Sequence, residues 1–298
     1  MKFVSFGEII WDIYGKERKI GGAPLNISAH ASLYGFDSYL ISAVGNDALG
    51  EEAFRKLKDL KVNTKYVKAN DELPTGQCIV SLDKNGIPDY NILSEAAYDL
   101  INAPDEALHD FDVLSFGTLA LRYEHNVKSL TEIIKRNTFG EIYADLNIRP
   151  PFYSEESVCF CLENASIVKI SDEELPLVTK LLSVEYDSPR DAAGQIAALY
   201  SNIKLLIITL GENGSFCVDS MNKETYFADK ISANVKSTVG AGDSFGAAFL
   251  ASYLKNPDIP EALNAAAHVS AYVVSSIEAI PLGSREVFER IKHYKLIP

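Results

Sequence analysis

The chain has 298 residues, of which 47% are hydrophobic and 23% are charged, and its 28 basic and 41 acidic residues give a formal net charge of −13. This size allows one large α/β domain or two ordinary domains, with a core that needs no disulfide or metal to hold it. The acidic balance argues against a nucleic-acid-binding protein, because phosphate contacts need clustered Lys and Arg.

Neither the N-terminus nor any apolar run predicts export or a membrane span. Between Met1 and Trp11 the only basic residue is Lys2, and Glu8 and Asp12 interrupt the apolar run, unlike a signal peptide. No stretch reaches the roughly 18 apolar residues of a spanning helix. The cysteines form no C-x-x-C pair and complete no zinc site, so we expect buried thiols in a reducing cytosol. They are Cys78, Cys159, Cys161 and Cys217.

The first third of the chain alternates between apolar runs and helical spacing. Residues 2–10 predict one buried strand, and the apolar spacing of 26–34 predicts a helix that ends at Gly35. A second strand over 38–44 precedes an amphipathic helix over 50–60.

The stretch from about 64 to 95 has a different character. It contains two β-rich pieces, 77–82 and 89–93, joined by Asp83-Lys84-Asn85-Gly86, and Asn-Gly is a strong hairpin signal. A hairpin that interrupts an alternating α/β chain predicts a small separate flap.

From residue 113 onward strands again alternate with helices. This alternation predicts a mainly parallel, doubly wound sheet flanked by helices, in one domain over 1–298. The predicted strands are 113–117, 141–146, 165–170 and 205–210, followed by the edge hairpin strands 216–219 and 225–231. The predicted helices are 125–136, 188–200, 242–254 and 260–277.

The most informative segment is Ser237-Thr238-Val239-Gly240-Ala241-Gly242-Asp243-Ser244-Phe245, which opens an apolar helix. Small residues at a helix start leave N–H groups that can bind an anion. An acid beside that anion would repel it, which suggests that Asp243 takes a proton from a hydroxyl attacking a phosphate held by Gly240, Ala241 and Gly242. The alternative is an ordinary helix start with Asp243 as a capping residue.

Further polar sets follow predicted strands, where open α/β sheets bind their ligands. Asp12, Gly22 and Asn26 suit a polyhydroxy ligand, or they are turn residues. The residues Asp145, Asn147 and Arg149 alternate onto one side of a strand end. Arg149 can bind hydroxyls, a carboxylate or a phosphate, or it pairs with Asp145 and only shapes the loop.

Two sets near the middle of the chain concern the nucleotide and a metal. Thr209, Gly211 and Gly214 follow the most apolar strand and can meet nucleotide phosphate or ribose, or simply link two strands. The acids of Lys169-Ile170-Ser171-Asp172-Glu173-Glu174 can hold a water-coordinated Mg²⁺. Equally, Ser171 and Glu174 have the spacing of a capping box, the interpretation favoured by the residues alone.

In their order along the chain, these motifs resemble those of the ribokinase-like carbohydrate kinases, the PfkB family, and most closely its fructokinases. The first signature, Gly21-Gly22-Ala23-Pro24-Leu25-Asn26, continues through Tyr34-Gly35 to Val44-Gly45-Asn46-Asp47 and Gly50. The second is Thr238-Val239-Gly240-Ala241-Gly242-Asp243. Between them lie Pro74-Thr75-Gly76-Gln77, Asp145-x-Asn147-x-Arg149 and Thr209-Leu210-Gly211-x-x-Gly214, so the resemblance covers essentially the whole chain.

The resemblance implies a cytosolic enzyme that transfers a phosphoryl group from ATP to a sugar hydroxyl, with the 6-hydroxyl of fructose as acceptor. It implies a ribokinase-like fold whose β-rich lid, over about 13–21 and 64–95, closes on the sugar and makes a homodimer contact. Asp243 would be the catalytic base, and Gly240, Ala241 and Gly242 would supply the anion hole. The other implied site residues are Asp12, Gly22, Asn26 and Arg149 for the sugar, Thr209, Gly211 and Gly214 for the nucleotide, and Glu174 for Mg²⁺ through water.

The sequence departs from the family at two accessory positions. Ser237 stands where the family usually has Asp in a loop that binds a monovalent cation, so activation by K⁺ stays open, with carbonyls near Ser237 and over 279–283 as the remaining ligands. Ser171 stands at the usual Asn of an Asn-x-x-Glu motif, whereas Glu174 is kept.

Several other functions stay as alternatives. A 2-keto-3-deoxygluconate kinase would pair its substrate's carboxylate with Arg149, but the lid segment 90–97 lacks the Arg that such kinases often carry. Other sugar kinases of the family and a non-catalytic sugar-binding regulator on the same fold also remain. A nicotinamide dehydrogenase fits poorly, because Phe245 stands where Gly-x-Gly-x-x-Gly needs its last glycine.

Overall fold

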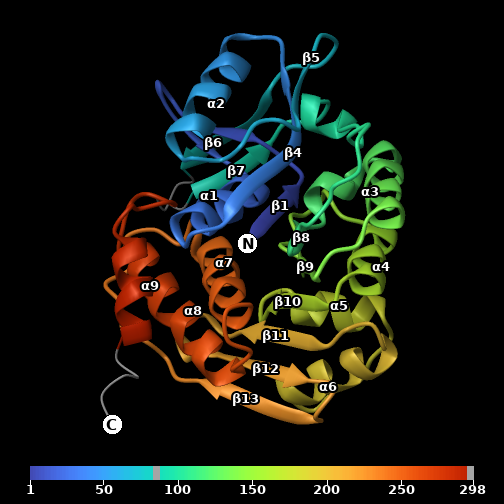
Figure 1. Cartoon of the computed structure of the whole chain (residues 1–298), viewed down its shortest axis with the longest axis vertical. Helices are drawn as coiled ribbons and strands as arrows, with labels where there is room; N and C mark the ends of the chain where they lie inside the picture. The colour runs from blue at the N-terminus through green and yellow to red at the C-terminus, as the bar shows by residue number, and fades with distance from the viewer. Residues whose placement is uncertain (83–87, 294–298) are drawn as a thin grey trace.

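A large, mainly parallel sheet forms the body of the protein in this computed structural model, which describes residues 1–82 and 88–293 (Figure 1). Within these residues the strand order is β13-β12-β11-β10-β9-β8-β1-β4-β5. Neighbouring strands from β5 to β11 run parallel, whereas β12 is antiparallel to both β11 and β13. The strands are β1 (Lys2–Phe6), β4 (Asp37–Gly45), β5 (Val67–Asn70), β8 (Val113–Phe116), β9 (Glu141–Asp145), β10 (Ile167–Ser171), β11 (Leu205–Thr209), β12 (Ser215–Asp219) and β13 (Glu224–Ala228).

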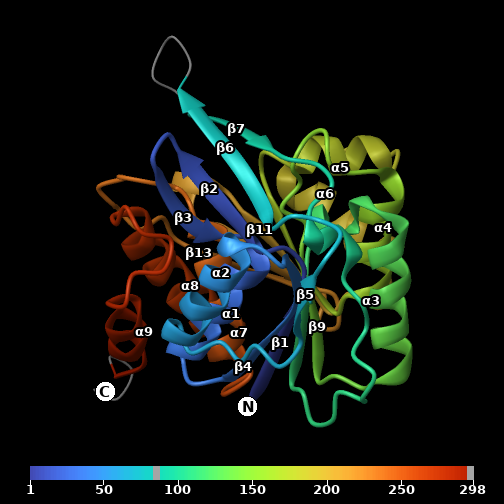
Figure 2. The same ribbon diagram turned by 90° about the horizontal axis from the view of Figure 1, so that it is seen from above.

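Helices cover both faces of this sheet, as Figures 1 and 2 show, which confirms the predicted doubly wound α/β class. Side chains alternate between the faces along each strand. In β1, Phe3 packs with the residues of α1, α7 and α8, whereas Val4 packs with those of α3 to α6. The helices are α1 (Ala23–Leu33), α2 (Ala48–Asp59), α3 (Glu124–Arg136), α4 (Glu155–Asn164), α5 (Leu175–Leu181), α6 (Pro189–Leu199), α7 (Ala241–Tyr253), α8 (Ile259–Val274) and α9 (Ser284–His293).

A second, small sheet lies beside the body and has the order β3-β2-β6-β7. Its strands are β2 (Ile10–Tyr14), β3 (Glu17–Gly21), β6 (Gly76–Leu82) and β7 (Pro88–Ile92), and Figure 2 shows β6 and β7 extending away from the body. The hairpin of β6 and β7 is antiparallel, and its predicted turn, 83–86, lies outside the described residues. β5, which falls inside the predicted flap of 64–95, instead joins the large sheet next to β4.

The prediction of one strand over 2–10 is wrong. β1 ends at Phe6 because only Lys2–Phe6 pairs with β4, and the chain then crosses to the small sheet, where β2 starts at Ile10. Periodicity could not show this break, because both strands are apolar and the crossing residues 7–9 are themselves buried.

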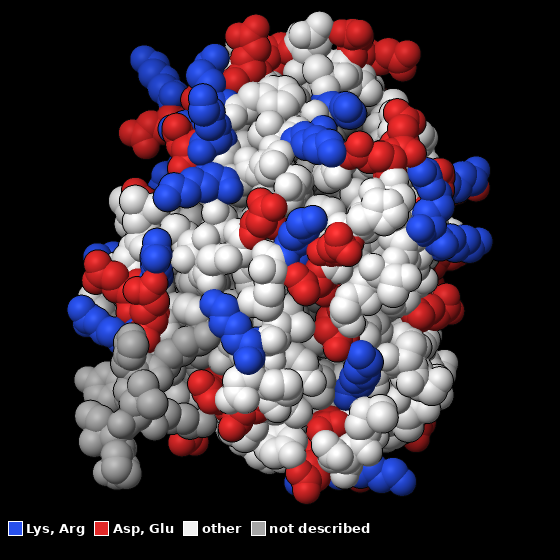
Figure 3. Space-filling model, in the orientation of Figure 1, with Lys and Arg blue, Asp and Glu red and all other residues white. Residues whose placement is uncertain are grey.

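Figure 3 shows acidic and basic side chains interspersed over one face instead of gathered into a basic patch. The four cysteines, all within the described residues, form no disulfide; three of them are buried and Cys159 is half-buried. Among the described helices, none has both the length and the apolar character needed to cross a membrane.

Candidate active site

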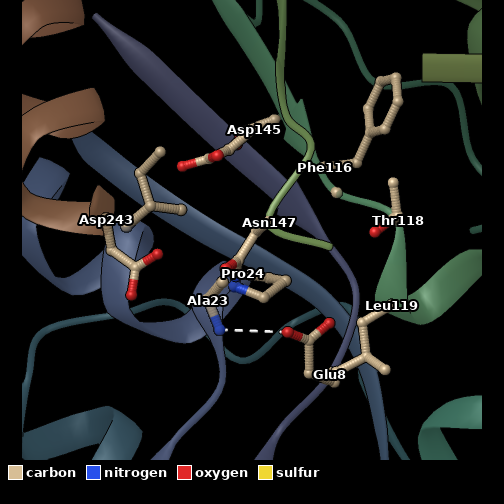
Figure 4. Close-up of a pocket in the computed structure, with 12 residues that line it drawn as sticks. Glu8, Ala23, Pro24, Phe116, Thr118, Leu119, Asp145, Asn147 and Asp243 are labelled. Carbon is tan, nitrogen blue, oxygen red and sulfur yellow. Dashed lines mark hydrogen bonds between the residues drawn. The ribbon is translucent and has the colours of Figure 1, made fainter. Parts of the chain in front are cut away.

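A pocket lies at the carboxyl edge of the large sheet, where parallel strands end and two helices begin (Figure 4). Its walls come from the residues after β1, β8 and β9 and from the first turns of α1 and α7. It is lined by Glu8, Ala23, Pro24, Ile27, Ser115, Phe116, Gly117, Thr118, Leu119, Asp145, Asn147 and Asp243. The first and last thirds of the sequence therefore meet at one site.

Asp243 reaches this pocket from the first turn of α7 (Figure 4). The turn depends on Gly240, which has φ +80°, and a Cβ added there would come within 2.8 Å of the Ala279 carbonyl oxygen and Cβ. Asn26 Nδ2 donates a hydrogen bond to Asp243 Oδ2 at 2.8 Å. Burial raises the pKa of Asp243 to about 6, against the hydrogen bond from Asn26, so the carboxylate is mostly ionised at neutral pH.

The start of α7 also supplies backbone donors. Ala241 N already donates to the Thr238 carbonyl at 3.2 Å, which closes the turn before the helix. Within the described parts of the chain, the N–H of Gly242 has no such intramolecular bond. Of the three predicted anion-hole amides, Ala241 is therefore used within the turn, whereas Gly240 and Gly242 donate to no backbone carbonyl of the described residues.

Glu8 is a pocket residue that the sequence interpretation missed. It is only 4% exposed, and its Oε1 accepts a hydrogen bond from Ala23 N at 3.1 Å, at the start of α1 (Figure 4). Gly22 precedes that helix with φ +107°, and a Cβ there would lie 2.5 Å from the Glu8 carbonyl oxygen. Burial raises the pKa of Glu8 to about 7. The signal in the sequence was an acid inside an apolar run, which periodicity alone cannot assign to a helix start fifteen residues away.

Asp12 lies on the small sheet and does not line the pocket. It sits within β2, opposite Lys19 of β3 and Cys78 of β6, so the expectation that it follows the end of a body strand is wrong. Burial raises the pKa of Asp12 to about 6, while the charges of Arg149 and Lys19 lower it. Asp12 is thus a half-buried carboxylate on the element that faces the body.

The end of β9 differs from the predicted alternation. β9 stops at Asp145, and Asn147 has φ +40°, so Asp145, Asn147 and Arg149 do not continue one extended strand. Asp145 and Asn147 line the pocket, whereas Arg149 is exposed. The alternative pairing of Asp145 with Arg149 is wrong as well, because Asp145 pairs with Lys169 of β10.

Glu174 uses its carboxylate within the protein. Its Oε2 accepts from Ser171 N at 2.7 Å and Ser171 Oγ at 2.9 Å, and its Oε1 accepts from Ile148 N at 2.5 Å. With the Glu174 N to Ser171 Oγ bond at 3.3 Å, this is the hydrogen-bond pattern of a capping box. Among the described residues no group of three His, Cys, Asp or Glu side chains is placed to hold a metal.

Thr209, Gly211 and Gly214 lie at the end of β11, outside the pocket. Thr209 pairs with Ser171 of β10 and Ser215 of β12, and the following turn closes with a bond from Leu210 N to the Gly214 carbonyl at 2.9 Å. A side chain at Gly211 would meet no atom within 4 Å. Gly211 is exposed, whereas a Cβ at Gly214 would clash with the Ala228 carbonyl oxygen. The predicted nucleotide residues therefore lie apart from the pocket, at the carboxyl end of β11.

Comparisons with known proteins agree with this geometry. The model of the pfkB family carbohydrate kinases matches residues 4–284. The chain is 29% identical to a fructokinase of Salmonella typhimurium over 79% of this chain and 77% of that protein, and 29% identical to a sugar kinase of Pyrococcus horikoshii over 84% and 82%. A crystal structure of fructokinase from Xylella fastidiosa with bound ATP shares the fold with a TM-score of 0.84 at 20% identity, covering 98% of both chains. The predicted class, an ATP-dependent carbohydrate kinase, is confirmed, and the chain belongs to the pfkB family.

Proposed function

We propose that this chain is a cytosolic fructokinase that transfers the terminal phosphoryl group of ATP to the 6-hydroxyl of fructose. The observation that carries the proposal is the placement of Asp243, which is held by Asn26 at a helix start and faces a pocket. Fructokinases among the chain's relatives, and ATP bound in the Xylella fastidiosa structure, support the substrate and the donor.

In this proposal Asp243 accepts the proton of the sugar hydroxyl as its oxygen bonds to phosphorus and the bond to the ADP oxygen breaks. A carboxylate with a pKa of about 6 is a weak base, but the hydroxyl becomes acidic as the new bond forms, so a late proton transfer suffices. The backbone of Gly240, Ala241 and Gly242, together with the start of α7, would stabilise charge on the transferred group.

The nucleotide would lie at the carboxyl end of β11, along Thr209, Gly211 and Gly214. Mg²⁺, when bound, would neutralise charge on the phosphate oxygens, and Glu174 would meet it only through water. The role of Glu174 in the protein is to join the ends of β9 and β10 through Ile148 and Ser171. Because Ser237 stands where the family usually has the Asp of its cation loop, the assay below is run with and without K⁺.

The small sheet would act as the lid, with Asp12 as its sugar ligand beside Gly22 and Asn26. Closure would exclude water from the phosphoryl group and limit hydrolysis of ATP. The proposal includes a homodimer contact through this lid, whose strands leave Ile79 38% and Tyr90 47% exposed on opposite faces.

We expect Asp12→Ala to raise the KM for the sugar far more than the KM for ATP. The carboxylate can accept two hydrogen bonds from sugar hydroxyls, whereas the predicted nucleotide residues follow β11 of the large sheet. Initial rates with each substrate varied in turn measure the two constants. An equal rise in both would remove Asp12 from the sugar site.

We expect Arg149→Ala to lower activity on neutral sugars and acidic sugars alike. An equal loss would agree with a neutral hexose as the substrate. Arg149 is exposed, and its charge lowers the pKa of Glu8, Asp12 and Asp243, so it serves the whole acidic site and is not dedicated to one ligand carboxylate. The measurement is kcat/KM for fructose and for 2-keto-3-deoxygluconate. A loss confined to the acidic sugar would favour the 2-keto-3-deoxygluconate kinase instead.

The direct test is a coupled assay of ADP release, with and without K⁺, against fructose, ribose, tagatose, 2-keto-3-deoxygluconate and adenosine. Fructose is expected to give the highest kcat/KM. Turnover of another sugar would move the assignment within the family, and binding of sugar without ADP release would favour the non-catalytic regulator.

A further inference from the structure

A buried ion pair lies directly behind the first turn of α7. Lys169, in the middle of β10, donates to both carboxylate oxygens of Asp145 at 2.9 Å. The two side chains are only 6% and 11% exposed. A Cβ added at Gly242 would come within 3.2 Å of Lys169 Nζ and 3.7 Å of Asp145 Oδ2, so the pair packs against the helix start that carries Asp243.

Burial of an ammonium group in an apolar strand is costly, and replacing such a pair by apolar residues is often neutral for stability. Lys169 shares its face of the sheet with the fully buried Ile167 of β10 and Ile207 of β11, whereas Val168 and Ile170 point to the opposite face. The position of the pair, beside Gly242 and open to the pocket through Asp145, therefore points to a role at the site and not in the core.

Asp243 is surrounded by polar groups from several elements. They are Glu8 from the residues between β1 and β2, Asn26 from α1, Tyr143 and Asp145 from β9, Arg149 from the loop after β9, and Lys169 from β10. Of the two cations in this set, Arg149 is exposed and Lys169 is buried. Solvent weakens the field of Arg149, so Lys169 is the cation whose charge acts most strongly on Asp243.

We propose that Lys169 and Asp145 are a positioning pair for the reaction, in which Lys169 keeps Asp243 ionised and Asp145 fixes the ammonium group beneath Gly242. The proposal rests on the proposed function, because it assumes that Asp243 is the general base. The two partners act in opposite directions: the charge of Lys169 lowers the pKa of Asp243, and the charge of Asp145 raises it.

This opposition defines the experiment, which measures kcat/KM against pH for Lys169→Met, Asp145→Asn and the double variant. Lys169→Met leaves Asp145 unopposed, so the acid limb is expected to move up by about one pH unit. Asp145→Asn leaves the ammonium unopposed and is expected to move the limb down. The double variant is expected to return it close to the wild-type position.

Lys204→Met is the matched control. Lys204 pairs with Glu141 at 2.9 Å at the other end of the same strand, β9, and is 47% exposed. Lys204→Met removes a lysine–carboxylate pair from the same sheet, at the end of β9 opposite to Asp145. The acid limb of kcat/KM against pH is therefore expected to stay at its wild-type position.

A second readout separates this inference from the proposed function. Carboxyl-carbon NMR titration, with the Asp243 signal assigned from Asp243→Asn, follows ionisation without turnover. If Asp243→Asn were fully active while the NMR shifts held, the proposed base would fail, and only the effect of the pair on the ionisation of Asp243 would stand. If the variants fold by circular dichroism but Asp243 titrates unchanged, the pair serves only the fold. If Lys169→Met does not fold, the proposal is tested by Asp145→Asn alone, in which the pKa of Asp243 is expected to move down.

Discussion

Asp243→Asn is expected to lower kcat by about 10² to 10⁴, the range for the loss of a general base, while sugar binding stays near normal. The amide keeps the size of the carboxylate and can still accept the hydrogen bond from Asn26, but it cannot take the proton of the hydroxyl. The same residue sets the pH dependence. Because burial raises the pKa of Asp243 to about 6, wild-type kcat/KM is expected to fall as the pH drops through that value.

Asp191→Asn provides the control for this variant. Asp191 is the third residue of α6, as Asp243 is of α7, but it is exposed and does not line the pocket. Its loss removes an acid from the same helical position, so turnover is expected to stay at the wild-type level. Unchanged turnover in Asp243→Asn itself would remove the base from the mechanism.

Arg122→Met is expected to lower the free energy of unfolding by about 3–5 kcal/mol, because it leaves a buried carboxylate without its partner. Arg122 pairs with Asp99 through Nε at 2.7 Å and Nη2 at 2.8 Å, and both side chains are only 4% exposed. Its Nη2 also donates to the Leu93 carbonyl at 3.1 Å, where the chain leaves β7 for the body. Guanidinium chloride unfolding measures the loss.

Two further variants show whether the loss of stability comes from the unpaired buried charge. Arg285→Met removes an arginine whose pair with Glu289 is 59% and 54% exposed, so it is expected to cost less than about 1 kcal/mol. The double variant Arg122→Met with Asp99→Leu removes both buried charges and is expected to be more stable than Arg122→Met alone. If Arg122→Met cost no more than Arg285→Met, the buried pair would not hold the return from the small sheet.

The fold class could be predicted because its signal is local. Strands such as Leu205–Thr209 and helices such as Glu124–Arg136 each carry their own periodicity, and their alternation predicts a parallel sheet covered on both faces. Helices α4 and α9, with ten residues each, were not predicted. For α5, the spacing of Ser171 and Glu174 indicated a helix start but gave no range, and the helix has only seven residues.

The glycine-rich turn before Asp243 was likewise visible in the sequence, because it is a contiguous motif whose residue types are needed for its backbone. The partners of that motif were not visible. Asn26 lies 217 residues away from Asp243, and Lys169 lies 24 residues away from Asp145. Such contacts depend on which strands become neighbours in the sheet, and the hydrophobic periodicity of a segment does not predict strand order.

The sequence by itself determined the alternating α/β plan, the helix start at Gly240 and the acid that follows it, because backbone conformation and amphipathicity depend on neighbouring residues. Only the tertiary structure decided that Phe6 ends the first strand, that Glu8 meets the start of α1, and that Lys169 and not Arg149 pairs with Asp145. These outcomes follow from strand order and register, which bring distant residues into hydrogen-bond range.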